Sequence, residues 1–204
     1  MRELMIHIQE ILQFLLTVSD KMYNSIVKIK TKNIFGTGFL MKIEKNNVKK
    51  FLFTYSHIVT PDLIELNEDL EICYGKFDEI KKYIKLDKNL RYIKSFEKEK
   101  DITIIEIIES DEIPDDKFLS PDLNCSAGYN NYSGEKIIIA GYPIDKINKG
   151  RHISSGEIIG IINNIEFQHN ADTKNGSSGS PICSFHKQFV IGIHKQGDKK
   201  NKCN

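Results

Sequence analysis

Hydrophobic residues change their spacing at about residue 24 of the chain. Before that point, apolar positions recur at intervals of three and four residues, at Ile8, Ile11, Leu12, Leu15 and Leu16. This spacing is typical of an amphipathic helix, and the polar residues that interrupt the run argue against a membrane span or a secretory signal. We expect residues 1–24 to form a helix that packs on the body of the protein. The alternatives are a helix that faces a partner or a membrane surface, and a weak signal peptide.

After residue 24, short apolar runs alternate with turns rich in glycine, proline and polar residues, which is typical of β-strands. Strands are predicted at residues 25–31, 37–43, 50–56, 69–74, 102–109, 136–140, 157–162, 181–184 and 189–193. Residues 76–100 are charged and show few strand signals, and residues 110–134 are interpreted as a long connection. This pattern predicts an all-β fold of two successive antiparallel units.

The net charge and the hydrophobic content of the chain exclude some classes of function. The 204 residues carry 29 Lys and Arg against 28 Asp and Glu, a net charge of +1, whereas proteins dedicated to nucleic acids carry a strong basic excess. A hydrophobic content of 40% is enough for a sizeable core, so wholesale disorder is not expected. We therefore predict a folded protein with no nucleic-acid partner and no membrane span.

The four cysteines, Cys73, Cys125, Cys183 and Cys203, lie far apart, and no pair has the C-x-x-C spacing of a zinc or redox site. A chain of this length does not need disulfides for its stability. We therefore predict free thiols, a reducing cytoplasmic location, and neither a metal site nor a cofactor.

The segment NGSSGSP, residues 175–181, is the sharpest candidate for chemistry. A serine between glycines on a tight loop can present its hydroxyl, because glycine adopts backbone conformations closed to other residues. Ser178 is then a candidate nucleophile, and the N–H groups of Gly176 and Ser178 are candidates for an oxyanion hole. An ordinary glycine and serine turn is the alternative when this segment is considered alone.

Two further residues favour the catalytic interpretation of Ser178 over an ordinary turn. His57 follows an apolar strand in the segment TYSHIVT, and Asp101 opens the apolar run DITIIEI. Each residue alone is more often structural than catalytic. Together with Ser178 they occur in the order His, Asp, Ser, which is one of the chain orders of a catalytic triad.

With these residues the sequence resembles the trypsin-like (chymotrypsin-fold) serine peptidases, over residues 25–197. The resemblance is carried by five motifs in the right order: GTGF at 36–39, TYSHIV at 54–59, DITII at 101–105, GYP at 141–143 and GSSGSP at 176–181. The GIH segment at 192–194 looks most like the glutamyl-endopeptidase (V8-like) branch.

The resemblance implies two packed antiparallel β-barrels with the active site between them. Ser178 would be the nucleophile, His57 the general base and Asp101 the carboxylate that orients the imidazole. The expected division is a helix over 1–24, a first barrel over 25–117, a connection over 118–134 and a second barrel over 135–204.

The resemblance also suggests which residues bind the substrate. In the glutamate-specific branch the histidine that matches His194 contacts the substrate side chain at P1, the residue before the scissile bond. This predicts Glu at P1, with Gln or Asp also compatible, together with Thr173 in the pocket and Lys195, Gln196 and Gly197 pairing with the substrate backbone. Asp172 leaves a basic P1 residue open, because trypsins carry an aspartate at the matching position.

A serine endopeptidase that acts on protein or peptide substrates is the function that the sequence favours. Family members continue beyond the position of Gly197 through another strand and a terminal helix, whereas seven polar residues follow it here. This departure favours the alternative of an inactive peptide-binding module on the same fold, and the predicted N-terminal helix is a candidate to cover the surface. An α/β hydrolase is disfavoured, because residue 180 is Ser where that fold has glycine.

Overall fold

The computed structural model describes residues 20–32, 34–44, 47–75, 78–96, 100–143 and 150–195. Residues 20–25 are helical and lead directly into the first strand. The rest of the helix expected over residues 1–24 lies outside the described residues. Met22 of the short helix is buried among side chains from both sheets, so residues 20–25 pack on the body of the protein.

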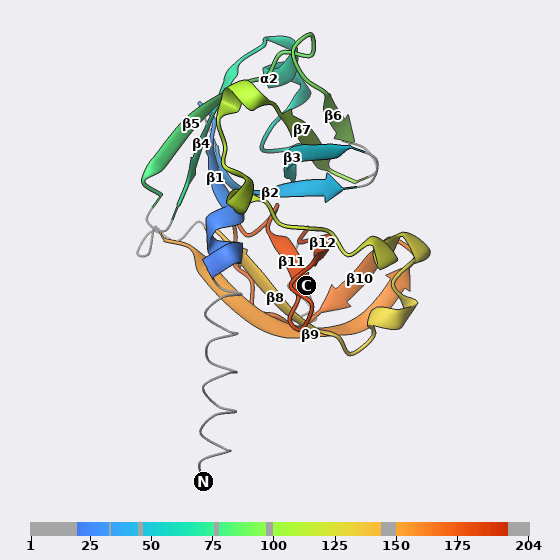
Figure 1. The fold of residues 1–204 in the computed structure, drawn as a ribbon. Helices are drawn as coiled ribbons and strands as arrows, with labels where there is room; N and C mark the ends of the chain where they lie inside the picture. Colours follow the sequence, from blue (N-terminus) through green and yellow to red (C-terminus); the bar gives the residue numbers. More distant parts are fainter. Residues whose placement is uncertain are drawn as a thin grey trace, which may run out of the picture.

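The first sheet has seven strands in the order β5-β4-β1-β2-β3-β7-β6 (Figure 1). They are β1 (Ile26–Lys30), β2 (Phe35–Glu44), β3 (Val48–Tyr55), β4 (Asp69–Tyr74), β5 (Ile80–Lys85), β6 (Ile93–Phe96) and β7 (Ile102–Ile107). Adjacent strands are antiparallel. In β7 alternate residues are buried, as expected for a sheet with one face on a core. That core includes Val27, Leu40, Leu52 and Ile105.

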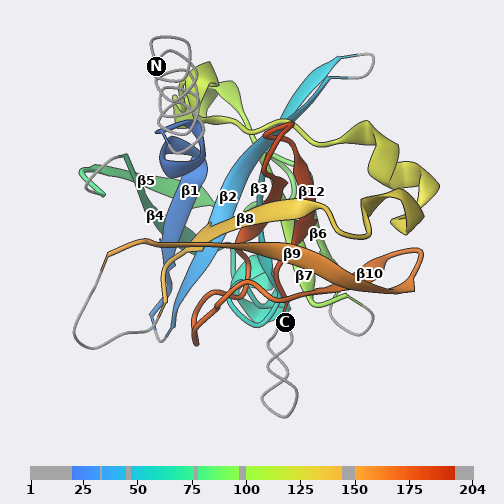
Figure 2. The same cartoon turned by 90° about the horizontal axis from the view of Figure 1, so that it is seen from below.

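The second sheet has five strands in the order β10-β9-β8-β11-β12. They are β8 (Lys136–Gly141), β9 (His152–Asn163), β10 (Glu166–His169), β11 (Pro181–Ser184) and β12 (Val190–Ile193). Both sheets are curled, and β9 bends along the outer side of the second one (Figures 1 and 2). The predicted all-β fold of two antiparallel units is confirmed.

Three strands were not predicted from the sequence: β5, β6 and β10. Only one of the six side chains of β5, that of Ile84, is buried, and its lysines face solvent. Charged residues are common on strands at a sheet edge, where they oppose pairing with other chains, but they also hide the strand from a search for apolar runs. The structure also has helix α2 (Pro61–Glu65) and, along the connection, the 3-10 helices η1 (Glu109–Asp111), η2 (Asp115–Lys117), η3 (Leu123–Ala127) and η4 (Asn130–Tyr132).

The two sheets share an apolar core. Its buried members are Met22, Ile26, Phe39, Met41, Leu119, Ile138, Ala140, Tyr142, Cys183 and Val190. The connection bonds to both sides of it: Leu119 N donates to Leu40 O of β2 at 3.0 Å, and Val190 N of β12 donates to Ser120 O at 2.9 Å. The packing therefore holds the two sheets at a fixed separation. Within the ranges that the structure describes, no helix has the length and apolar character needed to cross a membrane.

Candidate active site

His57 and Asp101 are joined at one end of the first sheet. His57 follows β3, and Asp101 directly precedes β7, which is paired with β3. The His57 Nδ1 atom lies 2.7 Å from Asp101 Oδ2, and the His57 backbone N–H donates to Asp101 Oδ1 at 3.1 Å. Since Nδ1 faces the carboxylate, Nε2 is the ring nitrogen left for another partner.

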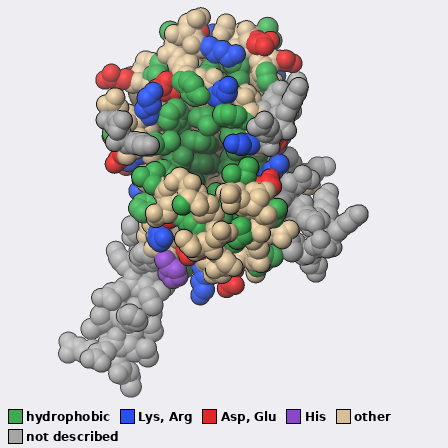
Figure 3. Space-filling view, turned by 90° about the vertical axis from the view of Figure 1, so that its right-hand side faces the viewer, with side chains coloured by type: hydrophobic (Ala, Val, Ile, Leu, Met, Phe, Trp, Pro, Cys, Tyr) green, Lys and Arg blue, Asp and Glu red, His purple; other side chains and the backbone are tan. Residues whose placement is uncertain are grey.

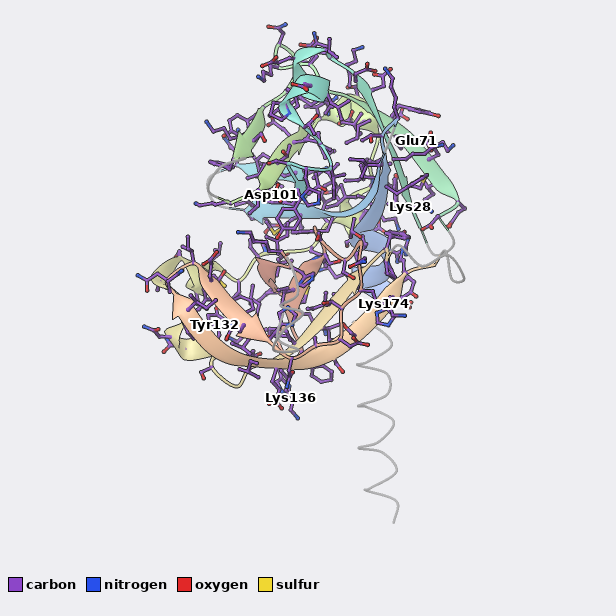
Figure 4. All side chains as sticks on the ribbon, turned by 180° about the vertical axis from the view of Figure 1, so that it is seen from behind. Lys28, Glu71, Asp101, Tyr132, Lys136 and Lys174 are labelled. Carbon is purple, nitrogen blue, oxygen red and sulfur yellow. The ribbon has the colours of Figure 1, made fainter. Side chains whose placement is uncertain are left out.

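The backbone around Asp101 holds this arrangement. Asp101 has a left-handed φ of 53°, a conformation that aspartate tolerates better than most residues. Its carbonyl accepts a bond from Ser56 N at 3.1 Å, so it is attached to the segment that carries His57. Figure 4 shows Asp101 on the part of the first sheet that lies towards the second.

The position of the His57 imidazole is further restricted by hydrogen bonds at the neighbouring Ser56 hydroxyl and by one aromatic ring that stacks on it. The Ser56 hydroxyl accepts bonds from Ser95 at 2.9 Å and from Thr103 at 3.2 Å, and Thr103 lies on β7. The Tyr55 ring stacks on the His57 ring with centroids 5.4 Å apart. The half-exposed imidazole is therefore fixed on one side and open on the other.

The Ser178 loop is held against β2 by glycines. Gly179 has a φ of 90°, and its N–H donates to His194 O at 3.1 Å. A Cβ atom at Gly179 would lie 2.2 Å from the carbonyl oxygen of Thr37, a contact that backbone atoms cannot relieve. The Thr37 hydroxyl donates to Gly176 O at 3.0 Å. Thr37 therefore ties the first sheet to the loop of the second, and the close approach requires glycine.

The Ser178 hydroxyl donates to the carbonyl oxygen of Lys195 at 2.8 Å. The hydroxyl therefore does not use the His57 imidazole as its acceptor in this conformation. In the described part of the chain, the N–H groups of Gly176 and Ser178 donate to no protein acceptor. Two free amides beside a serine hydroxyl are the donors that an oxyanion needs.

The remaining predicted residues are distributed around this loop. Thr173 is half-buried and Asp172 exposed on the segment that leads to Ser178, beside Lys174 (labelled in Figure 4). Lys195 is exposed, and its carbonyl accepts the bond from Ser178. Gln196 and Gly197 lie outside the described residues.

His194 is buried and contacts a second histidine that sequence reasoning missed. His169 ends β10, and its Nε2 lies 3.2 Å from Nδ1 of His194. They are 2% and 3% exposed. The pKa of each is lowered to about 4, by burial in both cases and, for His169, also by the neighbouring His194. No local motif marked His169, because the pair forms only when β10 and β12 face each other.

The two histidines line a cavity between the sheets with a volume of about 510 Å³. Most of its other lining side chains are apolar, among them Phe39, Phe53, Tyr129, Phe167 and Ile182. Figure 3 shows hydrophobic side chains gathered in the middle of one face of the molecule. Lys195 is also a lining residue of the cavity, and its carbonyl oxygen accepts the bond from the Ser178 hydroxyl.

Acidification is expected to destabilise the fold through the histidine pair. The folded protein keeps both rings neutral down to about pH 4, whereas the unfolded chain binds protons near pH 6.5. Their contribution to stability is complete above pH 6.5 and is lost as the pH falls towards 4, by at most about 1.4 kcal/mol per pH unit for each ring. Urea unfolding between about pH 7 and pH 5 should show this slope. His169→Phe should reduce it, and an unchanged slope would contradict the prediction. The exposed His186→Ala variant is the control and should retain the slope.

Among the described residues, no three His, Cys, Asp or Glu side chains lie together as a metal ion would require. Cys73, Cys125 and Cys183 are free thiols, and Cys203 lies outside the described residues.

Comparisons with known proteins identify the family and the fold of the chain. A family model described as "Trypsin-like peptidase domain" matches residues 36–193. No match was found among curated proteins. The chain is similar to the inactive form of the Rv3671c protease, with a TM-score of 0.63 and 16% identity over 91% of this chain and 84% of that one.

The chain is similar in fold to two other crystal structures. An inactive serine-to-alanine mutant of Rv3671c from M. tuberculosis H37Rv gives a TM-score of 0.61 and 15% identity over 91% of this chain and 82% of that one. A serine endoprotease from Yersinia pestis gives 0.60 and 13%, over 90% of this chain and 57% of that one. At these identities the likeness shows the fold alone.

Proposed function

The chain belongs to the trypsin-like peptidase domain family, and we propose that it is a serine endopeptidase whose catalytic residues are Ser178, His57 and Asp101. One observation carries the proposal: Asp101 holds His57 by Nδ1 at 2.7 Å and leaves Nε2 free. A serine hydroxyl is a weak nucleophile at neutral pH without such a base.

The proposed reaction proceeds through an acyl-enzyme. Ser178 Oγ attacks the carbonyl carbon of the scissile peptide bond while His57 Nε2 takes the hydroxyl proton. The imidazolium then gives this proton to the departing amine, and a water molecule hydrolyses the ester with the same base. The N–H groups of Gly176 and Ser178 stabilise the negative oxygen of each tetrahedral intermediate.

The Ser178 hydroxyl must change its partner for this reaction. It donates to Lys195 O at 2.8 Å in the structure, and rotation about its Cα–Cβ bond redirects it towards His57. A substrate strand that lies beside Lys195 and Gln196 adds its own backbone N–H groups there. Such a donor competes for the Lys195 carbonyl and releases the serine.

The substrates that we propose are peptides and proteins with Glu, Gln or Asp at P1. His194, at the cavity that begins beside Lys195, supports this assignment, since an imidazole can bond to a carboxyl or amide group. Thr173 is the second candidate for this pocket. Neither Thr173 nor the exposed Asp172 lines the cavity, so the cavity does not discriminate between these two residues, and a basic P1 residue stays the alternative.

Covalent labelling tests the nucleophile. A fluorophosphonate should add once to the purified full chain, and intact-mass measurement should detect the adduct. Ser178→Ala should remove the adduct, whereas the exposed Ser155→Ala should retain it. Labelling requires both an activated serine and an oxyanion hole, so an unlabelled but folded wild-type protein would refute the proposed mechanism.

A non-catalytic peptide-binding module on the same fold is the second candidate. The bond from Ser178 to Lys195 favours it, because a serine held in this way is not activated. Folded protein that resists labelling but binds peptides would support this candidate.

A further inference from the structure

The buried hydroxyl of Thr37, on β2 of the first sheet, bridges two segments that belong to the second sheet. The Tyr142 N–H, directly after β8, donates to Thr37 Oγ1 at 2.8 Å, and Thr37 Oγ1 lies 3.0 Å from Gly176 O. A hydroxyl has a single proton to donate. Because Tyr142 N supplies the proton of the first bond, the proton of Thr37 is directed to Gly176 O, and the direction of the second bond is fixed.

The carbonyl that receives this bond belongs to the peptide between the two candidate oxyanion donors. Gly176 O and Ser177 N are part of one planar peptide group. Ser177 N donates to Lys174 O at 3.0 Å, so both polar atoms of this peptide are bonded. One partner lies within the loop, and the other is the Thr37 hydroxyl. The orientation of this peptide determines how the N–H groups of Gly176 and Ser178, on either side of it, are directed.

The backbone at Gly176 does not fix this orientation by itself. Gly176 has a φ of 93°, in the region that favours glycine. Glycine adopts positive and negative φ about equally well, so steric restriction is weak at this residue. The orientation of the Gly176–Ser177 peptide therefore depends on its hydrogen bonds, and the bond from Thr37 is the one that comes from the first sheet.

Thr37 is held firmly enough to serve as a fixed partner. Its carbonyl accepts a bond from the Thr54 hydroxyl at 2.9 Å. Tyr142 is held in turn by Arg151, whose Nε donates to the Tyr142 hydroxyl and whose guanidinium lies over the ring, 5.3 Å from its centroid. The Arg151 side chain is buried and pairs with Asp78 at 2.8 Å. The Thr37 hydroxyl therefore connects the loop to well-bonded parts of both sheets.

The end of β8 also packs closely on the loop. A Cβ atom at Gly141 would lie 2.0 Å from Ser180 Oγ and 3.1 Å from Thr37 Oγ1. The loop is thus in contact with its neighbours as well as bonded to Thr37. A methyl group in place of the Thr37 hydroxyl would meet Gly176 O without bonding to it.

We propose that Thr37 is a positioning residue for the oxyanion hole: its hydroxyl orients the Gly176–Ser177 peptide so that the N–H groups of Gly176 and Ser178 converge on one point. This inference rests on the proposed function. Misplacement of a catalytic group by about 1 Å can lower the rate about 100-fold. Oxyanion donors act mainly where the negative charge develops, in the tetrahedral intermediates. The effect of Thr37 should therefore fall on kcat and not on KM.

Variants at residue 37 of the full chain test the proposal on one peptide substrate. Thr37→Val removes the hydroxyl but keeps the branched side chain, and should lower kcat about 100-fold with little change in KM. Thr37→Ser keeps the hydroxyl and should restore kcat close to the wild-type value. Thr37→Ala also removes the hydroxyl and replaces the valine variant if that protein does not fold. A folded variant without the hydroxyl that retains the wild-type kcat would overturn the proposal.

Ser184, at the far end of β11 from the Ser178 loop, provides the matched control. Its buried hydroxyl also accepts a backbone N–H, that of Lys187 at 3.2 Å, and donates to a second partner, Glu135 Oε1. Ser184→Ala therefore removes a bridging hydroxyl outside the candidate site, and should leave kcat unchanged. An equal loss of kcat in Ser184→Ala and Thr37→Val would reflect a general loss of stability and would overturn the role of Thr37.

Amide hydrogen exchange separates this inference from the proposed function. The Ser177 N–H should exchange faster in Thr37→Val than in wild type, on the order of tenfold, because its peptide is then bonded at one end only. Faster exchange in Thr37→Val together with no fluorophosphonate labelling of wild type would refute catalysis and retain the role of Thr37 in holding the loop. Equal exchange and equal labelling rates in the two proteins would retain catalysis and refute the role of Thr37.

Discussion

Replacing His57 with alanine should lower kcat for peptide hydrolysis by about 10⁶. The imidazole is the group that takes the Ser178 proton and later protonates the leaving amine, so its loss removes both proton transfers. KM should change little, since His57 is not among the residues that line the cavity beside His194. Residual activity from the oxyanion donors should remain above the uncatalysed rate.

Steady-state kinetics on one peptide measures this effect. The control is His186→Ala, which removes an exposed histidine from a turn before β12 and should leave kcat unchanged. Asp101→Asn should lower kcat by about 10⁴, because an amide at this position favours the wrong imidazole tautomer. A loss below tenfold in His57→Ala, with the fold intact, would show that this imidazole is not the base.

Arg91→Met should destabilise the folded protein by about 3–5 kcal/mol. The guanidinium and the Asp111 carboxylate form two parallel bonds of 2.6 and 2.9 Å, and their side chains are 3% and 5% exposed. Arg91 also donates to Glu106 O of β7 at 3.0 Å. Removing the arginine leaves the buried Asp111 carboxylate without its counter-ion in η1, directly after β7.

Urea unfolding of the purified variant measures the free energy of unfolding. The exposed Lys88→Met has the same new side chain and should stay within about 0.5 kcal/mol of wild type. The double variant Arg91→Met, Asp111→Asn removes both charges and should regain most of the loss, because no buried charge is left unpaired and the asparagine oxygen can still accept the bond from Ile108 N. A single variant as stable as wild type would show that the ion pair contributes nothing.

The strands with regular apolar patterns could be predicted from the sequence, and those at the sheet edges could not. β7 alternates apolar residues over a buried face, and its position was predicted to within two residues. β5 and β10 contain mainly polar or charged residues, and their pairing with β4 and β9 makes them strands. Periodicity reports burial, so a strand that buries few side chains is not detected by it.

In the candidate site, too, the features carried by short motifs could be predicted from the sequence, and those that depend on tertiary contacts could not. The chain order of His57, Asp101 and Ser178 and the glycines around Ser178 are local signals, since each residue stands in its own short motif. The bond from Asp101 to His57 follows from the pairing of β3 with β7. The bond from Ser178 to Lys195, in contrast, depends on a side-chain rotation that no motif encodes.

Fold class and the identity of the reactive residues follow from patterns that a few neighbouring residues carry: alternation, glycine positions and charge. The histidine pair and the character of the cavity follow only from the folded chain, because His169 and His194 lie 25 residues apart. His169 ends β10 and His194 directly follows β12, and these strands form the opposite edges of one sheet. Curling of that sheet brings the edges together and excludes water, and the loss of water lowers both pKa values. Desolvation is a property of the packed interior, so the sequence identifies the histidine at the pocket but only the tertiary structure decides that it is neutral.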